Sequence, residues 1–503
     1  MAVNQWENAE ATMSQPIRFY FRGAVQEVSR ALPTQTVLQH LRGNLHCTGT
    51  KEGCAEGDCG ACMVVIGSLR HGKVELKAVN SCIQLLPTLD GKALFSVADL
   101  QRADGGLHPV QQAMVDCHGS QCGFCTPGFV MSLWSLYLNL DGRQPRRRQI
   151  NDALSGNLCR CTGYRPIIEA AQRMGQLPPV ELDRDSLALQ LLSLRREKMA
   201  TYSACGQQFH APRSLDELVQ VCAALPHACL LAGGTDVGLW VTKQMRELGD
   251  VIYLGQVDAL KNISDADGML EIGAGVSLND AYEAVCAHYP DALMELWQRF
   301  ASLPIRNVGT LGGNLANGSP IGDSIPWLIA IGADVVLRGS EGQRVLALDD
   351  FYLAYQKKDL RPGEFLEAVR VPLPRAGQVL RTYKLAKRFD QDISAVCAAF
   401  AFTLDDGMVT SARVVFGGMA AIPKRAERTE AGLIGRPWSE STVTAAMADI
   451  GRDYAPLSDL RASSAYRMKA AQNLLRRFWF ETRPNAPLPA YAVNVFASRP
   501  EEN

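Results

Sequence analysis

The sequence lacks the features that mark membrane proteins and nucleic-acid-binding proteins. Its 51 Lys and Arg residues nearly balance its 52 Asp and Glu residues, so no global charge argues for either kind of partner. No apolar run approaches the roughly 18 residues that span a bilayer, and the stretch 328–337 is interrupted by Gly332 and Asp334. The sequence begins without a signal peptide, so we expect a cytoplasmic protein with neither disulfides nor a membrane anchor.

A dinucleotide-binding fingerprint is absent as well. The sequence contains no G-x-G-x-x-G motif, so a Rossmann domain is not supported. Two other glycine-rich loops occupy residues 229–238 and 307–323, and the first of them follows an apolar strand. Backbone amides in such loops can bind a pyrophosphate, although glycine runs are most often turns.

Cysteine, in contrast, is plentiful, and eight of the 15 cysteines form two sets of four. The first set has the spacing C-x4-C-x2-C with a distant fourth member: Cys54, Cys59, Cys62 and Cys82. This is the plant-type spacing for an iron–sulfur cluster. A structural zinc site is the alternative, although zinc ribbons usually pair two C-x2-C knuckles. Cys47 lies outside the pattern, and we predict that it is not a ligand.

The second set has the less common spacing C-x2-C…C-x-C and consists of Cys122, Cys125, Cys159 and Cys161. The first two cysteines precede Pro127 and the apolar run 129–140. This order predicts a helix N-terminus, where the helix dipole favours a thiolate and lowers its pKa. Cys159 and Cys161 must lie in a loop, because thiols one residue apart cannot share a helix face. Taken alone, the spacing also suits zinc; beside a ferredoxin motif it favours a second cluster.

The residues around both sets are similar to one family. The motifs are Gly49-Thr-Lys-Glu-Gly-Cys54, Gly57-Asp-Cys59-Gly-Ala-Cys62, Gln121-Cys122-Gly-Phe-Cys125-Thr-Pro-Gly128 and Gly156-Asn-Leu-Cys159-Arg-Cys161-Thr-Gly-Tyr164. They resemble the iron–sulfur part of the molybdenum hydroxylases, a family that includes xanthine dehydrogenase, aldehyde oxidase and carbon monoxide dehydrogenase. The resemblance implies two 2Fe–2S clusters, one in a β-grasp domain and one in a helical bundle nearer the molybdenum.

The resemblance also implies a multi-domain α+β fold. We expect a β-grasp ferredoxin domain over residues 16–103 and a helical-bundle 2Fe–2S domain over 104–176. A linker over 177–207 would follow, with an amphipathic turn at 187–194. A vanillyl-alcohol-oxidase-type FAD domain would span 208–376 and an α+β flavoprotein C-terminal domain 377–485. Residues 1–15 are polar and unpatterned, and we expect them to be loosely ordered.

Local patterns give the expected elements of these domains. Residues 17–28 alternate around Gly23 and predict a hairpin, and 37–42 predict a short helix that Gly43 ends. Residues 63–66, 74–76, 400–404 and 409–416 predict strands. Helices are predicted over 109–117, 128–139, 149–154, 166–175 and 464–479, with a further helix beginning at the capping-box-like Ser214–Glu217.

The second half of the chain resembles the FAD part of the same family. The resemblance implies non-covalent FAD contacts from two loops and a few residues outside them. These contacts are Leu231, Ala232, Gly233, Gly234, Thr235, Asp236 and Val237 in the first loop, Thr310, Gly312, Gly313, Asn314, Ser319, Pro320 and Asp323 in the second, and Phe300, Ala301, Leu366 and Lys384 elsewhere. Asp323 would hold ribose hydroxyls and Phe300 would lie against the flavin ring.

One segment departs from the family's pattern. In the family, the stretch around Asp390 and Asp392 lies near the flavin face where NAD meets it, but Phe389 replaces a basic residue here. The two aspartates could equally cap a helix. Cys205, Cys222, Cys229, Cys286 and Cys397 have no paired spacing, and we expect buried thiols at these positions.

The function implied by the resemblance is electron transfer. The chain ends at residue 503 without the family's molybdenum domain, so we expect no residue of it to catalyse substrate hydroxylation. A bacterial xanthine dehydrogenase small subunit has this arrangement. Its partner would be a molybdopterin-binding large subunit in a heterotetramer of two small and two large chains, approached through Gln121, and NAD+ would accept the electrons. The alternatives are an aldehyde or N-heterocycle dehydrogenase of the same family and a stand-alone iron–sulfur flavoprotein diaphorase.

Overall fold

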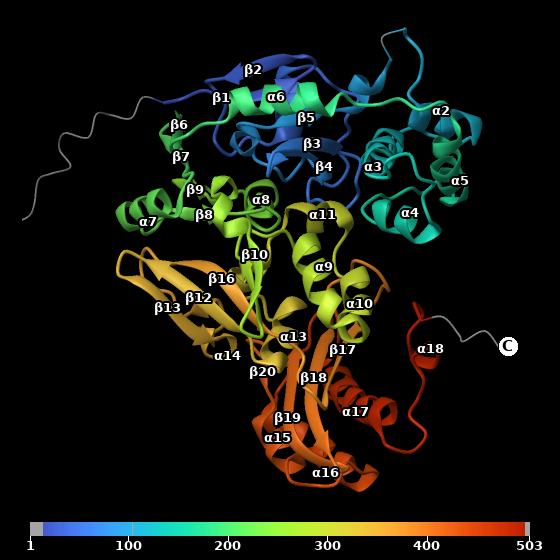
Figure 1. Cartoon of the computed structure of the whole chain (residues 1–503), viewed down its shortest axis with the longest axis vertical. Coiled ribbons are helices and arrows are strands. Elements are labelled where there is room, and N and C mark those ends of the chain that lie inside the picture. The colour runs from blue at the N-terminus through green and yellow to red at the C-terminus, as the bar shows by residue number, and fades with distance from the viewer. Residues whose placement is uncertain (1–13, 103, 498–503) are drawn as a thin grey trace, which may run out of the picture. The chain divides into compact units, whose positions relative to one another are not determined.

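The computed structural model describes residues 14–102 and 104–497, and it divides into two compact units. Unit 1 takes in the chain up to Ala259 together with Ser302–Gly309. Unit 2 takes in Leu260–Ala301 and the chain from Thr310 onward. Each unit is described by itself, and Figure 1 gives the element labels. Residues 1–13 of the N-terminal segment that we expected to be loosely ordered (1–15) lie outside the described residues.

Unit 1 begins with a five-stranded mixed sheet in the order β2-β1-β5-β3-β4. β1 pairs antiparallel with β2 and parallel with β5, as the predicted β-grasp domain requires. The predicted hairpin is confirmed, because Arg22 and Gly23 both take positive φ in its two-residue turn. The strands are β1 (Ile17–Phe21), β2 (Ala24–Val28), β3 (Met63–Arg70), β4 (Lys73–Asn80) and β5 (Ala93–Phe95).

Short helices cover the turns of this first part. The helix predicted over 37–42 is a single α turn, α1 (Val37–Gln39), which Thr36 caps and which continues as the π-helix η1 (His40–Asn44). It thus passes Gly43, where we expected it to end. Two 3₁₀ turns follow, η2 (Leu86–Leu89) and η3 (Val97–Leu100).

Four helices form the next part of unit 1, as predicted. They are α2 (Pro109–Asp116), α3 (Thr126–Leu138), α4 (Arg147–Ala153) and α5 (Arg165–Arg173), with the 3₁₀ turn η4 (Met174–Gln176) after α5. The apolar sequence of α3 fits its central place, since residues such as Phe129, Met131 and Leu133 are fully buried. The same core includes Met63 and Val65 of β3, so helices and sheet share one hydrophobic interior.

Residues 177–207, expected as a linker, carry two elements. α6 (Arg184–Leu194) buries Leu187, Leu191 and Leu194 and crosses the first sheet, as Figure 1 shows. β6 (Ala200–Ala204) belongs to a four-stranded sheet in the order β6-β7-β9-β8. The other elements here are β7 (Gln207–Ala211), α7 (Leu215–Ala224), β8 (Cys229–Leu231), α8 (Val237–Thr242), β9 (Val251–Tyr253) and the turns η5 (Leu254–Gln256) and η6 (Asp258–Lys261), the last of which reaches unit 2.

A short segment from later in the chain completes unit 1. α11 (Leu303–Val308) lies against β4, and Asn307 Nδ2 donates to the carbonyl of Ala78 over 3.0 Å. Arg306 is only 1% exposed, and its guanidinium pairs with the carboxylate of Asp152 on α4. The sequence did not predict this placement, because the partners lie about 150 to 230 positions away.

Unit 2 contains two main sheets. The first is five-stranded in the order β10-β11-β16-β12-β13. Its core gathers Ile272, Leu293, Trp327 and Val335 from strands and helices. The elements are β10 (Ile263–Ala266), β11 (Met269–Gly273), α9 (Leu278–His288), α10 (Pro290–Arg299), α12 (Leu311–Asn317), α13 (Ser324–Ile331), β12 (Asp334–Gly339), β13 (Gly342–Ala347), α14 (Leu348–Phe351), β14 (Tyr352–Ala354), β15 (Lys357–Lys358) and β16 (Phe365–Pro372).

The second sheet of unit 2 is four-stranded in the order β17-β18-β19-β20. Aromatic residues fill its core, where Phe400 and Phe402 both contact Phe478. The strands predicted over 400–404 and 409–416 and the helix predicted over 464–479 are present within longer elements. These are β17 (Gln378–Leu385), β18 (Val396–Asp405), β19 (Met408–Gly417), β20 (Lys424–Arg425), α15 (Glu427–Leu433), α16 (Glu440–Asp453), α17 (Ser464–Thr482) and α18 (Ala490–Val493).

Across the described ranges, 14–102 and 104–497, none of the helices is both long enough and apolar enough to traverse a bilayer.

Candidate functional site

The first set of cysteines comes together in the loop before β3 and the turn after β4. The thiol of Cys54 contacts those of Cys59 and Cys82, and Cys82 also contacts Cys62. The backbone amide of Cys59 donates to Cys54 Sγ over 3.4 Å, and Asn80 Nδ2 lies 3.9 Å from Cys62 Sγ. All four predicted ligands are therefore neighbours, with amide donors aimed at their sulfurs as an iron–sulfur site requires.

Hydrogen bonds among the four thiols lower the pKa values of two of them and raise those of the other two. Hydrogen bonds from Cys59 and Cys82 hold the pKa of Cys54 below its ordinary value. A hydrogen bond from Cys82 likewise lowers the pKa of Cys62, against the effect of burial. The donating thiols of Cys59 and Cys82 have raised pKa values for the same reason. The hydrogen bonds that lower the pKa values of Cys54 and Cys62 favour the thiolate, which is the form that binds metal.

The backbone around the first set leaves room only for a glycine. A Cβ atom on Gly53 would lie 2.8 Å from Cys59 Sγ, closer than carbon and sulfur approach. The loop therefore wraps the thiols at a distance that a side chain would prevent. This close fit suits a compact cluster.

Cys47 stands apart from the first set. Its thiol donates to the carbonyl of Leu45 over 3.4 Å, and it lies in a hydrophobic core with Phe19 and Leu41. Burial raises the pKa of Cys47. These surroundings favour a neutral core thiol, in line with the prediction that Cys47 is not a ligand.

The second set lies where α3 begins and in the loop before α5. Cys125 is the N-cap of α3, and its thiol contacts Cys159, while Cys161 contacts Cys122. Our expectation of a lowered pKa at this helix start is wrong for Cys125, because burial raises its pKa to about 12 and the contact with Cys159 adds to the effect. Burial also acts upward on Cys159, but hydrogen bonds from Thr162 bring its pKa below the ordinary value.

In the first set the thiol contacts run from Cys59 through Cys54 and Cys82 to Cys62, whereas the second set forms two separate pairs. In the part of the chain that the structure describes, no three Cys, His, Asp or Glu side chains converge closely enough to hold one metal ion. The contacts named above nevertheless bring all eight predicted ligands into thiol–thiol contact, four in each set. Four thiolates are the ligand number of a 2Fe–2S cluster, so the donor chemistry fits the cluster that the sequence predicts.

The two sets also lie against each other within unit 1. The backbone amide of Leu158 donates to the carbonyl of Cys59 over 3.0 Å. A Cβ atom on Gly60 would lie 2.2 Å from the carbonyl oxygen of Gly156, and Gly60 has φ +72°. Asn157, which is 2% exposed, reaches the carbonyl of Gly60 over 3.4 Å. Direct backbone contact thus joins the two cysteine segments.

The first glycine loop lies in unit 1 between β8, which ends at Leu231, and α8, which begins at Val237. It contains Ala232, Gly233, Gly234, Thr235 and Asp236. A Cβ atom on Gly233 would lie 1.9 Å from the carbonyl oxygen of Val308, and Gly234 has φ +75°. Gln84 Nε2 donates to the carbonyl of Gly233 over 3.0 Å. The loop therefore touches the segment that follows the predicted ligand Cys82. Burial raises the pKa of Asp236.

The part of the second glycine loop from Thr310 onward lies in unit 2 and is built around α12. Thr310 caps this helix, since its hydroxyl accepts from the amide of Gly313 over 2.9 Å. Gly312 packs on Ala274, where a Cβ atom would lie at 2.4 Å. The side-chain oxygen of Asn314 is buried and has no hydrogen-bond partner among the residues that the structure describes. A buried acceptor without a partner suits a polar ligand such as FAD. Ser319 and Pro320 continue the loop, where the Ser319 hydroxyl accepts from Ile321 over 3.3 Å.

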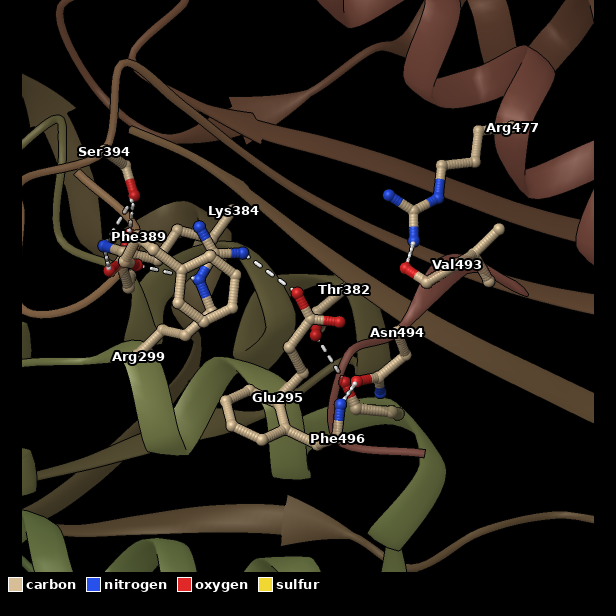
Figure 2. A network of polar contacts seen from close by, with 12 residues as sticks. Glu295, Arg299, Thr382, Lys384, Phe389, Ser394, Arg477, Val493, Asn494 and Phe496 are labelled. Carbon is tan, nitrogen blue, oxygen red and sulfur yellow. Dashed lines mark hydrogen bonds and ion pairs between the residues drawn. The ribbon is translucent and has the colours of Figure 1, made fainter. Parts of the chain in front are cut away.

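Asp323 and Lys384 are brought together in unit 2. The Lys384 ammonium pairs with the Asp323 carboxylate, and it donates to Ser394 Oγ over 3.0 Å; Figure 2 shows Lys384 and Ser394 side by side. The Ser394 hydroxyl donates to the second carboxylate oxygen over 2.5 Å. Both charged groups are at most 5% exposed. The roles predicted for them toward FAD stay predictions, since in the structure each binds the other.

The residues predicted to contact the flavin from outside the two loops have different surroundings. Phe300 stacks on Tyr282 with 5.6 Å between ring centroids, and Ala301 has φ 49°. Leu366 lies on β16 with its side chain in the core of unit 2, which leaves little of it for a ligand. Gln121 is exposed, as a residue that meets a partner would be.

A polar and aromatic network that the sequence did not predict surrounds Arg299 (Figure 2). Its guanidinium lies over the Phe389 ring at 4.3 Å from the centroid and donates to Glu295 over 2.9 Å. Phe389 in turn contacts Phe496 near the C-terminus, with 5.9 Å between centroids. The replacement of a basic residue by Phe389 was the only signal for this network. Of the two aspartates nearby, Asp392 closes a turn by accepting from the amide of Arg388 over 2.9 Å.

Comparison with known families assigns three consecutive parts of the chain. A [2Fe-2S] binding domain matches residues 96–172. The FAD binding domain in molybdopterin dehydrogenase matches 203–374, and the CO dehydrogenase flavoprotein C-terminal domain matches 381–482.

Individual relatives agree with these matches. A xanthine dehydrogenase of Emericella nidulans is 30% identical over 92% of this chain, which spans only 38% of that relative's length. Among solved structures, a chain of carbon monoxide dehydrogenase from Hydrogenophaga pseudoflava is 29% identical with a TM-score of 0.51, over 54% of this chain and 94% of that one. A chain of quinoline 2-oxidoreductase from Pseudomonas putida 86 is 28% identical with a TM-score of 0.51, over 55% and 97%. The predicted multi-domain fold is confirmed, and the chain combines 2Fe–2S-binding, FAD-binding and flavoprotein C-terminal domains, as the molybdenum hydroxylases do.

Proposed function

We propose that this chain is the electron-transfer subunit of a bacterial NAD-dependent xanthine dehydrogenase. Two 2Fe–2S clusters and FAD, when bound, would carry electrons from purine hydroxylation, hypoxanthine to xanthine to urate, to NAD+. Cys54, Cys59, Cys62 and Cys82 would hold one cluster, and Cys122, Cys125, Cys159 and Cys161 the other. The two glycine loops, with Phe300 and Lys384, would hold the flavin.

The observation that carries this proposal is a set of direct contacts in unit 1 between the two cysteine segments and the first glycine loop. The second cysteine set joins the first through the hydrogen bond from Leu158 to Cys59, and the segment after Cys82 joins the first glycine loop through Gln84 and Gly233. A Cβ atom on Gly238 would lie 2.6 Å from the carbonyl oxygen of Ile83, beside Cys82. These contacts hold the cofactor-binding segments of unit 1 close together, as electron transfer between their cofactors would require. A chain that merely stored metal would not need them.

The partner in the proposal is a molybdopterin-binding large subunit, in a cytoplasmic complex of two small and two large chains. Gln121 would face that subunit beside Cys122. Purine turnover would take place on the large subunit, since none of the predicted ligands here is assigned to substrate chemistry.

A second candidate is the same role in an aldehyde or N-heterocycle dehydrogenase. The structural similarity to quinoline 2-oxidoreductase favours it, because quinoline is an N-heterocycle. The native complex, purified through a tag on this chain, separates the candidates when it is assayed with hypoxanthine, quinoline and an aldehyde, each with NAD+. Urate formation coupled to NADH supports the first proposal. Turnover of quinoline or aldehyde alone favours the second, and NADH–dye activity without any co-purified molybdenum subunit indicates a diaphorase.

A further inference from the structure

The loop that presents Cys159 is closed by three hydrogen bonds among its own residues. The backbone amide of Cys159 donates to the phenol oxygen of Tyr164 over 3.0 Å. The backbone amide of Tyr164 donates to Thr162 Oγ1 over 3.2 Å. Thr162 Oγ1 lies 3.2 Å from Cys159 Sγ. The three bonds form a ring that holds the hydroxyl of Thr162 against the sulfur of one predicted cluster ligand.

The direction of the bond between Thr162 and Cys159 follows from the chemistry of the two groups. A cysteine that binds a cluster does so as thiolate and has no proton to donate. The hydroxyl oxygen of Thr162 already accepts one proton, from the amide of Tyr164. Its own proton is therefore free to point at the sulfur, since a hydroxyl donates once and accepts twice.

We propose that Thr162 donates a hydrogen bond to the sulfur of Cys159 and thereby raises the reduction potential of the second cluster, with Tyr164 as the positioning residue. This inference rests on the proposed function, in which the second cysteine set binds a cluster. Reduction adds one negative charge to the cluster and its sulfurs. A donor aimed at a ligand sulfur stabilises the reduced state more than the oxidised state.

The backbone of Tyr164 shows that its position is specified by its surroundings. Tyr164 has φ 69°, a left-handed conformation that costs free energy for a residue other than glycine, at the N-cap of α5. Its ring packs edge-on against the buried Phe129 at 6.1 Å between centroids. This contact fixes the ring, and the ring places the phenol oxygen at the amide of Cys159. The loop thus holds its geometry through contacts to α3.

The test compares Thr162→Val with Thr162→Ser in the full chain by potentiometric titration followed by EPR. Val keeps the shape of Thr and removes the hydroxyl, whereas Ser keeps the hydroxyl. We expect Thr162→Val to lower the potential of the second cluster, with a threefold to tenfold shift in its reduction equilibrium, tenfold being about 59 mV for one electron. Thr162→Ser should stay near wild type, and the first cluster should keep its potential in both. An unchanged potential in Thr162→Val would overturn the proposal.

A matched control is available beside another ligand of the same set. Thr126 follows Cys125, but its hydroxyl lies 2.7 Å from Ser120 Oγ. Thr126→Val should therefore leave the potential unchanged, and an equal shift in both variants would assign the effect to local packing and overturn the proposal. Tyr164→Phe should give part of the shift, because the loop loses the acceptor for the amide of Cys159.

A second measurement detects the proton of the hydrogen bond itself. Pulsed EPR of the reduced wild-type chain should show, on the second cluster, a proton coupling that disappears in D2O and is absent in Thr162→Val. If the wild type shows the same proton couplings as Thr162→Val, the inference is overturned, while the cluster itself remains established. Absence of any second cluster signal in the wild type would instead overturn the proposed function.

Discussion

The backbone amide of Leu158 donates a hydrogen bond to the carbonyl of Cys59 over 3.0 Å. Leu158 immediately precedes Cys159, so this hydrogen bond directly connects the backbone segments that carry the two cysteine sets. About 100 positions separate the partners along the sequence, and the bond forms because Gly60 lets its loop approach the carbonyl of Gly156 without a side chain between them. This relationship leads to the first prediction.

Gly60→Ala should separate the two cysteine segments. A Cβ atom there would meet the carbonyl oxygen of Gly156 at 2.2 Å, and φ is +72°. We expect a loss of about 2–4 kcal/mol in the free energy of unfolding, from overpacking and backbone strain together. Gly72→Ala is the control, because Gly72 has φ +76° but no atom within 4 Å of the added Cβ. It should cost only about 1 kcal/mol. Equal melting temperatures for the two variants would contradict the close contact.

Cys47→Ser and Cys82→Ser should have opposite effects on the first cluster. The thiol of Cys82 contacts those of Cys54 and Cys62, whereas Cys47 Sγ donates to the carbonyl of Leu45. Cys47→Ser should keep the plant-type EPR signal, and Cys82→Ser should abolish or distort it. A signal that disappears in Cys47→Ser alone would reverse the assignment of the fourth ligand.

The pair formed by Asp323 and Lys384 should behave as one unit. Lys384→Met leaves a carboxylate that is 3% exposed without its cation, so we expect a loss of roughly 3–5 kcal/mol in stability. Adding Asp323→Leu in the same chain should recover much of that loss, because the double variant buries no unpaired charge. Thermal unfolding of the two single variants and the double variant measures this coupling. Strict additivity of the three values would show that the pair is not coupled.

His108 should make the helical part of unit 1 less stable in acid. Burial lowers the pKa of His108 to about 4, from an ordinary value of 6.5. Between these pH values the unfolded chain binds more protons than the folded chain, so the free energy of unfolding falls as the pH drops from 6.5 toward 4. We expect His108→Asn, which can still cap α2, to flatten this pH dependence by roughly 2 kcal/mol.

The control for this prediction is His118→Asn. The side chain of His118 is exposed, and we expect this variant to keep the pH dependence of the wild type. Unfolding monitored by tryptophan fluorescence between pH 4.5 and 7.5 gives the slope, since Trp134 contacts the His108 ring at 6.4 Å between centroids. An unchanged slope in His108→Asn would show that His108 does not titrate across this range.

The two cysteine sets could be recognised from the sequence because their signal is local. Cys54, Cys59 and Cys62 lie within nine positions, and the glycines beside them report how closely the backbone approaches the thiols. The four helices of unit 1 and the hairpin around Gly23 were also predicted, since periodicity and turn residues act over short distances.

Features made by distant residues escaped the same reasoning. The pairing of Lys384 with Asp323 joins residues 61 positions apart, and Arg306 reaches Asp152 across 154 positions. Each residue by itself has the pattern of a solvated charge or a ligand contact. The raised pKa of Cys125 was missed for a related reason, because burial depends on the whole fold, whereas the helix start could be read locally.

The central claim is that this one chain binds two 2Fe–2S clusters and one FAD. Metal and flavin analysis of the full chain, purified under anaerobic conditions, tests it most directly, together with EPR of the reduced protein. The account predicts about four irons, no zinc and one FAD per chain, with two distinct EPR signals, of which Cys82→Ser removes one and Cys125→Ser the other. Zinc in place of iron at the second cysteine set, or a single EPR signal that both variants abolish, would contradict it.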